Sequence, residues 1–359
     1  IIHMGMPKTG STAIQETLAT NRDKLLSHGV LYPINPEPFS GQVKHLLYVS
    51  LLRRGDPGQW RRFPAAEAKI KKLYGNNFDY YGCWMDDLKK QIAVAKPHTI
   101  ILSEECFFGA LSKKRSNIHE NLKIFISDLK VKPEDLELIG YLRSPPDYYL
   151  SSCQQKLKSQ SSIKEISTAN YFSTLKQIRE FYLTQHKVFP FDRKIFPQGD
   201  VVRHFTKYAA GIELVSSGAP NETISGPAMS ILQEYRQLFF ADSDEKTSPR
   251  QVISLINALR DAGNRLGLSR PVLREDVKMF IWHSLTNDLA WLREVYGFDF
   301  NPPKVSYQNG FNITDDWIPE KVVDIIEFNE VDKNRLFQET IHQLMQKSKK
   351  IKGKEISET

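Results

Sequence analysis

The segment that joins the first predicted strand to the first predicted helix places the strongest constraint on the fold. Residues 1–4 (Ile-Ile-His-Met) form an apolar run that predicts a strand, and apolar residues recur at helical spacing from Ile14 until Gly29. Between them lies the loop Gly-Met-Pro-Lys-Thr-Gly-Ser-Thr, residues 5–12. A short glycine-containing connection from a strand into a helix is typical of a parallel sheet. The chain is therefore expected to be an α/β protein.

The chemistry of this loop suits an anion. The N-terminus of a helix presents unpaired backbone N–H groups and the positive end of the helix dipole. Gly10 lets the backbone approach a ligand without a Cβ atom in the way, and Ser11 and Thr12 add hydroxyl donors. Lys8 supplies a mobile positive charge. We predict that these residues, together with Thr9, bind an oxyanion.

The loop differs from the nucleotide P-loop, GxxxxGK[ST], in the place of its lysine. Gly5 and Gly10 have the P-loop spacing, but Ser11 stands where that motif has its lysine. Lys8 instead lies two residues before Gly10. A nucleotide kinase needs the P-loop lysine on the phosphates and Mg²⁺ on the following hydroxyl. A P-loop nucleotide or sugar kinase is therefore the alternative and not the first interpretation.

A second motif begins where a strand predicted at residues 136–142 ends. Arg143 follows this strand, and Ser151 lies eight residues later on a helix predicted to begin at Pro145. An arginine offers a planar fork of N–H donors that matches a phosphate group, and a serine hydroxyl donates to a further oxygen. This pair of residues therefore suits a second anionic group.

The two motifs together resemble the cofactor-binding motifs of sulfotransferases that use 3′-phosphoadenosine 5′-phosphosulfate (PAPS). In that family a Pro-Lys-[Ser/Thr]-Gly-[Ser/Thr]-[Ser/Thr] loop opens the first helix and binds the 5′-phosphosulfate. An arginine at a strand end and a serine eight residues later bind the 3′-phosphate. Residues 7–12 match the first pattern, and Arg143 with Ser151 matches the second. The resemblance is to the bacterial and carbohydrate-acting members and covers about residues 1–310.

The resemblance implies a three-layer α/β/α fold with a central, mostly parallel sheet and a helical C-terminal part. It implies in-line transfer of a sulfuryl group from PAPS to a hydroxyl or amine, leaving 3′-phosphoadenosine 5′-phosphate (PAP). Lys8 would stabilise the leaving group, and no metal is expected. The acceptor is expected to be a carbohydrate or glycolipid. The chain lacks the Arg-Lys-Gly segment of cytosolic small-molecule sulfotransferases, which argues against a phenol or steroid acceptor.

Two residues are candidates for the general base that deprotonates the acceptor. A strand predicted at 98–102 is followed by Ser103, Glu104 and Glu105, which resembles the Ser-x-Glu that related sulfotransferases carry at a strand end. This alignment makes Glu105 the carboxylate that would act as the base, with its neighbour Glu104 as the alternative. His45 is the second candidate, since histidine titrates near neutral pH. An exposed acidic pair and a structural histidine stay open as interpretations.

The rest of the chain is expected to form one domain over residues 1–345. An α/β core over 1–215 would precede a helical extension over 216–345, with a basic, disordered tail over 346–359. Further strands are predicted at 30–32 and 188–189, and further helices at 200–205, 228–240, 249–262 and 281–296. The basic and aromatic region 45–85 is expected to bind the acceptor. The first residues already predict a strand, so the sequence leaves open whether residues precede Ile1.

Composition excludes several other classes. The net charge of +7 suits anionic ligands, but no nucleic-acid-binding motif is present. Three sparse cysteines (Cys83, Cys106 and Cys153) predict neither a disulfide framework nor a zinc site. No run approaches the roughly 18 apolar residues that span a bilayer. A cytoplasmic enzyme is expected, with its oligomeric state open. A nucleotide-binding module without catalytic activity stays as an alternative from another class.

Overall fold

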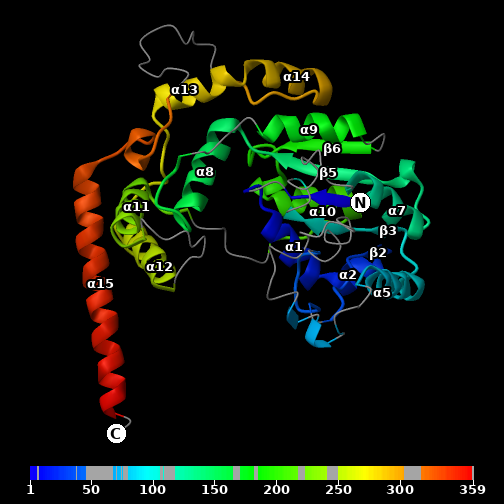
Figure 1. Ribbon diagram of the computed structural model, residues 1–359, viewed down its shortest axis with the longest axis horizontal. Helices are drawn as coiled ribbons and strands as arrows, with labels where there is room; N and C mark the ends of the chain where they lie inside the picture. Colours follow the sequence, from blue (N-terminus) through cyan, green and yellow to red (C-terminus); the bar gives the residue numbers. More distant parts are fainter. Residues whose placement is uncertain are drawn as a thin grey trace. The chain divides into compact units, whose positions relative to one another are not determined.

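A computed structural model describes most of the chain, in two compact units (Figure 1). The described residues are 1–5, 8–37, 39–45, 68–69, 71–73, 75, 80–105, 108, 118–164, 170–181, 185–216, 223–240, 250–302 and 317–357. The first unit contains Ile1–Ser144, Ala169–Gly218 and Asp288–Phe300. The second contains Pro145–Thr168, Ala219–Asn287 and Asn301–Thr359.

The first unit is built on a four-stranded parallel sheet in the order β4-β1-β5-β6. Its strands are β4 (Leu102–Glu104), β1 (Ile2–Met4), β5 (Glu137–Leu142) and β6 (Gln185–Pro190). In this register Met4 lies opposite Glu104 on one side and Gly140 on the other. The carboxyl ends of these strands therefore meet at one edge. This confirms the predicted α/β class with a central parallel sheet.

A second, two-stranded sheet continues from the first. It pairs β2 (Val30–Leu31) with β3 (Thr99–Ile100) in parallel. The N–H of Ile101 donates to the carbonyl of Leu31, and the N–H of Leu102 donates to the carbonyl of Ile1, both at 2.9 Å. The segment 99–104 thus pairs first with β2 and then with β1, so the strand expected at 98–102 serves both sheets.

Helices α1 (Ser11–Thr20) and α10 (Val201–Ala210) pack on the sheet through a buried apolar core. Ile14 and Leu18 of α1, Val202 and Phe205 of α10 and Ile139 of β5 all belong to this core. The remaining helices of this unit are α2 (Arg22–Ser27), α5 (Tyr80–Ala95), α7 (Ile118–Asp128), α9 (Asn170–Phe181) and most of α14 (Thr286–Tyr296), with short 3₁₀ turns at Pro133–Asp135 and Pro197–Gly199.

One helix expected from the sequence is broken in two. The apolar spacing from Ile14 predicted a single helix that ends near Gly29, but α1 ends before Asn21 and α2 begins after it. The backbone N–H and the side-chain amide of Asn21 both donate to the carbonyl of Thr17, at 3.1 and 2.8 Å. Asn21 therefore competes with helix continuation through its own side chain, as asparagine does at helix ends.

The second unit is helical. It contains α8 (Pro145–Leu157), α11 (Gly226–Phe240), α12 (Arg250–Arg265), α13 (Glu275–Ser284), α15 (Glu330–Ser357) and a 3₁₀ turn at Val322–Asp324.

The expected division near residue 215 differs from this arrangement, because α8 groups with the later helices and residues 288–300 group with the sheet. The helix expected over 281–296 is interrupted at Leu285, between α13 and α14. The tail expected to be disordered is helical as far as Ser357. Within the described ranges, no helix combines the length and the apolar character needed to cross a bilayer.

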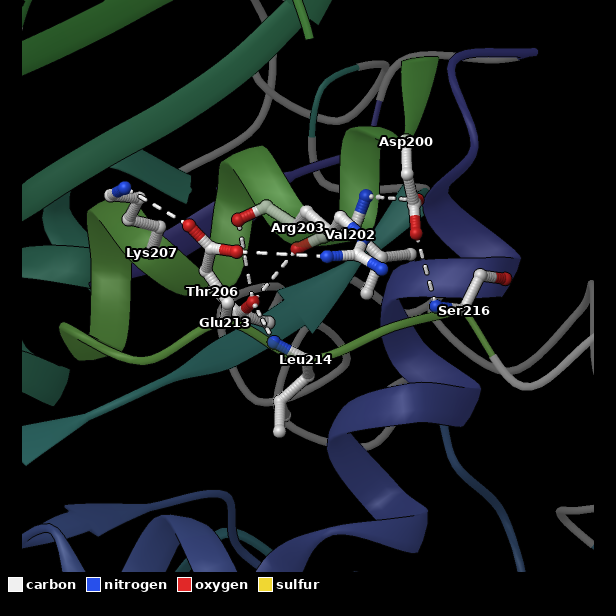
Figure 2. Close-up of polar contacts among 8 residues, drawn as sticks. All are labelled: Asp200, Val202, Arg203, Thr206, Lys207, Glu213, Leu214 and Ser216. Carbon is white, nitrogen blue, oxygen red and sulfur yellow. Dashed lines mark hydrogen bonds and ion pairs between the residues drawn. The ribbon is translucent and has the colours of Figure 1, made fainter. Parts of the chain in front are cut away.

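The start of α10 is fixed by Asp200, as Figure 2 shows. One carboxylate oxygen of Asp200 accepts the N–H of Val202 at 2.8 Å and caps the helix. The other accepts the N–H of Ser216 at 3.1 Å, which ties the segment after α10 back to its first turn. Val201 follows Asp200 directly and is buried in the core with α1. The cap therefore also sets the position of the helix end that packs beside the loop at residues 8–10.

The returning segment is held at a second point by Thr206. Its side chain is fully buried, donates to the carbonyl of Val202 at 2.9 Å and accepts the N–H of Leu214 at 3.0 Å (Figure 2). Glu213 forms ion pairs with Lys207 at 3.0 Å and with Arg203 at 3.6 Å. Buried polar groups need partners, whereas exposed ion pairs add little stability.

Thr206→Val is therefore expected to lower the free energy of unfolding by about 1–3 kcal/mol, because the N–H of Leu214 would be left buried without an acceptor. Urea denaturation measures this change. Lys207→Ala, which removes an exposed ion pair of the same helix, is the matched control and should cost less than about 1 kcal/mol. Equal losses in the two variants would contradict the role given to Thr206.

Candidate anion-binding site

The predicted loop lies at the point where the strand order of the sheet reverses. From β1 the chain first reaches β4 on one side and later β5 on the other. In open parallel sheets the crevice at the carboxyl ends beside such a reversal is the usual ligand site. The loop from Gly5 follows β1 there, Glu105 follows β4, and Arg143 follows β5. The topology thus brings three of the predicted elements to one edge.

Two residues of the loop adopt left-handed backbone conformations. Gly10 has a φ of 80° and Lys8 a φ of 68°. A Cβ atom on Gly10 would lie 2.8 Å from Cγ1 of Val201, so only glycine fits there without movement of α10. Gly10 is also the residue before α1, and it caps the helix with no side-chain hydrogen bond. The first-turn N–H groups of α1 are thus left uncovered by a capping side chain, which favours an anion at this helix end.

Gly5 approaches β4 closely. Its N–H donates to the carbonyl of Glu104 at 3.2 Å. A Cβ atom on Gly5 would lie 2.7 Å from Oγ of Ser11 and 2.8 Å from Cα of Glu105. The hydroxyl of Ser11 and the backbone of Glu105 therefore both pack against Gly5. Thr9 and Ser11 are buried, whereas Lys8 and Thr12 are half-buried.

Arg143 contacts the loop through its side chain. Its Nη1 donates to the carbonyl of Lys8 at 3.2 Å. The guanidinium lies over the ring of Phe191, 5.9 Å from its centroid, which is a cation–π arrangement. The ring of Phe191 also lies 3.6 Å from the Cβ position of Gly10. Phe191 directly follows β6 and was missed by the sequence analysis, although an aromatic residue at a strand end was the available signal.

The two candidate glutamates lie in different surroundings. The side chain of Glu105 is 32% exposed, and its carboxylate lies 3.8 Å from Nζ of Lys44, which is itself 41% exposed. Glu104 is the last residue of β4 and is only 3% exposed. Of the two, Glu105 is the more exposed to solvent. Lys44 was not predicted, because its place beside Glu105 depends on a contact distant in sequence.

His45 is held inside the protein. Its Nδ1 accepts the N–H of Ser103 at 2.9 Å, and its Nε2 donates to the carbonyl of Pro33 at 3.0 Å. Its own backbone N–H donates to the carbonyl of Ser103 at 3.1 Å. The ring is 1% exposed, and burial lowers its pKa to about 4. Both ring nitrogens thus bind the backbone, and the structure gives His45 a structural role in place of the predicted role as a base.

Ser103 is the centre of a buried polar network beneath the loop. Its hydroxyl lies 2.7 Å from Nδ1 of His3 and accepts from Nε2 of Gln15 at 3.2 Å. His3 belongs to β1, Gln15 to α1 and Ser103 to β4, and all three are fully buried. With His45, this network joins the elements on both sides of the loop.

The remaining predicted residues fall elsewhere. Ser151 lies on α8 in the helical unit and is half-buried. Most of the region 45–85 that was expected to bind the acceptor lies outside the described residues, and so does Cys106. Cys153 is buried with a free thiol. Among the residues that the structure describes, no three His, Cys, Asp or Glu side chains are grouped to hold a metal ion.

Comparison of the chain with protein-family models, with curated proteins and with solved structures found no match.

The burial of His45 predicts a pH-dependent stability. Its pKa of about 4 lies below the ordinary value of about 6.5, so the unfolded chain takes up a proton at a higher pH than the folded chain. The free energy of unfolding is therefore highest above about pH 6.5 and falls as the pH is lowered toward 4. Between about pH 7.5 and about pH 5, His45 should contribute a loss of about 2 kcal/mol.

His45→Gln cannot take up this proton, so its free energy of unfolding should fall by about 2 kcal/mol less than that of the wild type over the same range. Urea denaturation of both proteins at the two pH values measures the difference. Parallel pH profiles for the two proteins would contradict the buried, neutral state of His45.

Proposed function

We propose that this protein is a PAPS-dependent sulfotransferase with the three-layer, P-loop-like fold of that family. The observation that carries the proposal is the contact of Arg143 with the Lys8 carbonyl, at the sheet edge where Glu105 packs against Gly5. An anion cradle, a phosphate-binding arginine and an accessible carboxylate thus lie on one edge of one unit. These are the groups that a transfer from an anionic donor to a hydroxyl needs.

The residues present fit the two anionic groups of PAPS. The glycine at position 10 and the uncapped start of α1 form a cradle that a Cβ atom would disturb, which suits the 5′-phosphosulfate. Arg143 stands beside this cradle, one strand away from β1, which suits a 3′-phosphate. The assignment of Ser151 to the same phosphate stays a prediction from the resemblance. PAPS thereby differs from ATP, which has no 3′-phosphate for these residues to bind.

When bound, PAPS supplies the sulfuryl group and leaves as PAP. Lys8 neutralises the charge that develops on the leaving group, which is the electrostatic stabilisation that lowers such barriers most. Ser11, Thr12 and the loop backbone hold the sulfuryl and phosphate oxygens. Glu105 takes the proton of the acceptor hydroxyl, since its carboxylate is the accessible one of the acidic pair.

The acceptor is proposed to be a carbohydrate or glycolipid hydroxyl. A cytoplasmic location belongs to the same proposal, because sparse cysteines suit a reducing compartment. The basic region 45–85 is the proposed acceptor-binding segment.

Ligand binding tests the proposal first. PAP should raise the melting temperature of the protein, whereas ATP with Mg²⁺ should raise it much less, because only PAP carries a 3′-phosphate. Arg143→Ala should weaken PAP binding by about tenfold or more, since it removes charge-assisted hydrogen bonds to phosphate. Stabilisation by ATP with Mg²⁺ alone would instead support the kinase alternative and contradict the proposal.

Transfer of radiolabelled sulfate from PAPS to a panel of glycans and glycolipids tests the chemistry. Lys8→Ala is expected to lower kcat by about 10²–10³-fold, and Glu105→Gln by about 10²–10⁴-fold. Lys24→Ala, an exposed lysine on α2, is the control and should leave kcat unchanged. PAP binding without transfer to any acceptor, or normal turnover by Glu105→Gln, would favour the non-catalytic module or another base.

A further inference from the structure

A separate pocket lies wholly within the helical unit. It has a volume of about 220 Å³. Its walls are the segment 223–225 that leads into α11, the second half of α12, and the chain from Leu268 to Arg270. None of the residues assigned to the sulfotransferase site lines it. The pocket therefore needs an explanation of its own.

The lining of this pocket is basic and polar. Arg260 and Arg270 contribute two guanidinium groups, and neither aspartate nor glutamate is among the described lining residues. Hydroxyl and amide groups complete the polar part of the wall, from Thr223, Ser225, Asn264 and Ser269. Arginine is the side chain best suited to bind a phosphate or sulfate by two parallel hydrogen bonds. Hydroxyl and amide side chains can form hydrogen bonds with hydroxyl groups elsewhere on the same ligand.

Additional positive charge lies close to Arg260. The pKa of Lys158 is lowered by burial and by the charge of Arg260, so these two cations are near one another. The carbonyl of Lys158 in turn accepts from Nη1 of Arg236 at 3.2 Å, and the Arg236 guanidinium lies 5.5 Å from the centre of the Phe240 ring. Arg236 is 1% exposed. In the described part of the chain, no carboxylate forms an ion pair with Arg236 or with Arg270.

Arg260 and Arg270 raise the electrostatic potential at the pocket and attract anions. A negatively charged occupant is therefore stabilised by these two guanidinium groups.

We propose that this pocket binds a small polyhydroxyl molecule that carries one phosphate or sulfate ester, such as a single sugar ring. The volume is below the about 300–1,000 Å³ of pockets that hold drug-sized ligands, so one ring with one ester group is the appropriate size. Arg260 and Arg270 bind the ester oxygens, and the hydroxyl and amide side chains bind the ring hydroxyls. The proposal goes beyond the sulfotransferase reaction and does not depend on it.

Calorimetric titration of the full chain with glucose 6-phosphate, glucose 6-sulfate and glucose tests this proposal. At least one ester should bind, and glucose should bind at least about tenfold more weakly, because it lacks the anion. The ester that binds more tightly shows whether the pocket prefers a phosphate or a sulfate group. Arg260→Ala and Arg270→Ala should each weaken ester binding by about tenfold or more. Arg335→Ala, an arginine of α15 outside the pocket, should leave it unchanged.

Two controls separate this pocket from the proposed donor site. Lys8→Ala should retain ester binding, and Arg270→Ala should retain PAP binding. Arg270 is exposed, so its replacement should leave the fold intact, which the melting temperature checks. No binding of either ester would overturn the proposal. So would ester binding that survives both pocket variants, or that Lys8→Ala alone abolishes. Failure of PAP to bind would count only against the sulfotransferase proposal.

Discussion

The parallel register of β1 with β4 and β5 is the constraint on which the candidate site depends. Because Met4 lies level with Glu104 and Gly140, the loop after β1 starts beside Glu105. Strand β5 continues for two residues beyond this level, so Arg143, three residues past Gly140, follows about 10 Å farther along the strand direction, at about 3.3 Å per residue. The carboxylate therefore lies near the base of the loop, and the arginine reaches its outer part at the Lys8 carbonyl.

Contacts beneath the loop hold it against β4. Gly5 packs against Oγ of Ser11 and Cα of Glu105 and leaves no space there for a Cβ atom. Ser103 adds buried hydrogen bonds that join β4 to β1 and α1. These bonds position the strands and the helix relative to one another. Fixed positions of this kind are what electrostatic stabilisation of a reacting group requires.

Local patterns were sufficient to predict the loop, most strands and the place of Arg143 at the end of a strand. These features depend on apolar periodicity, glycine positions and the parallel connection, all of which are short-range. The role of His45 was not predictable, because the backbone groups of Pro33 and Ser103 that bind its ring are set by tertiary packing. The break at Asn21 was missed for a different reason, since apolar spacing gives no weight to a competing side-chain hydrogen bond.

Glu104 and Glu105 follow one another in the sequence but differ in burial. Glu104 is buried as the last residue of β4, whereas Glu105 lies beyond this strand and keeps a third of its side chain exposed beside Lys44. That ion pair is long and partly exposed, so it contributes little stability. In the proposed reaction, an acceptor hydroxyl can therefore displace Lys44 from the Glu105 carboxylate at small cost.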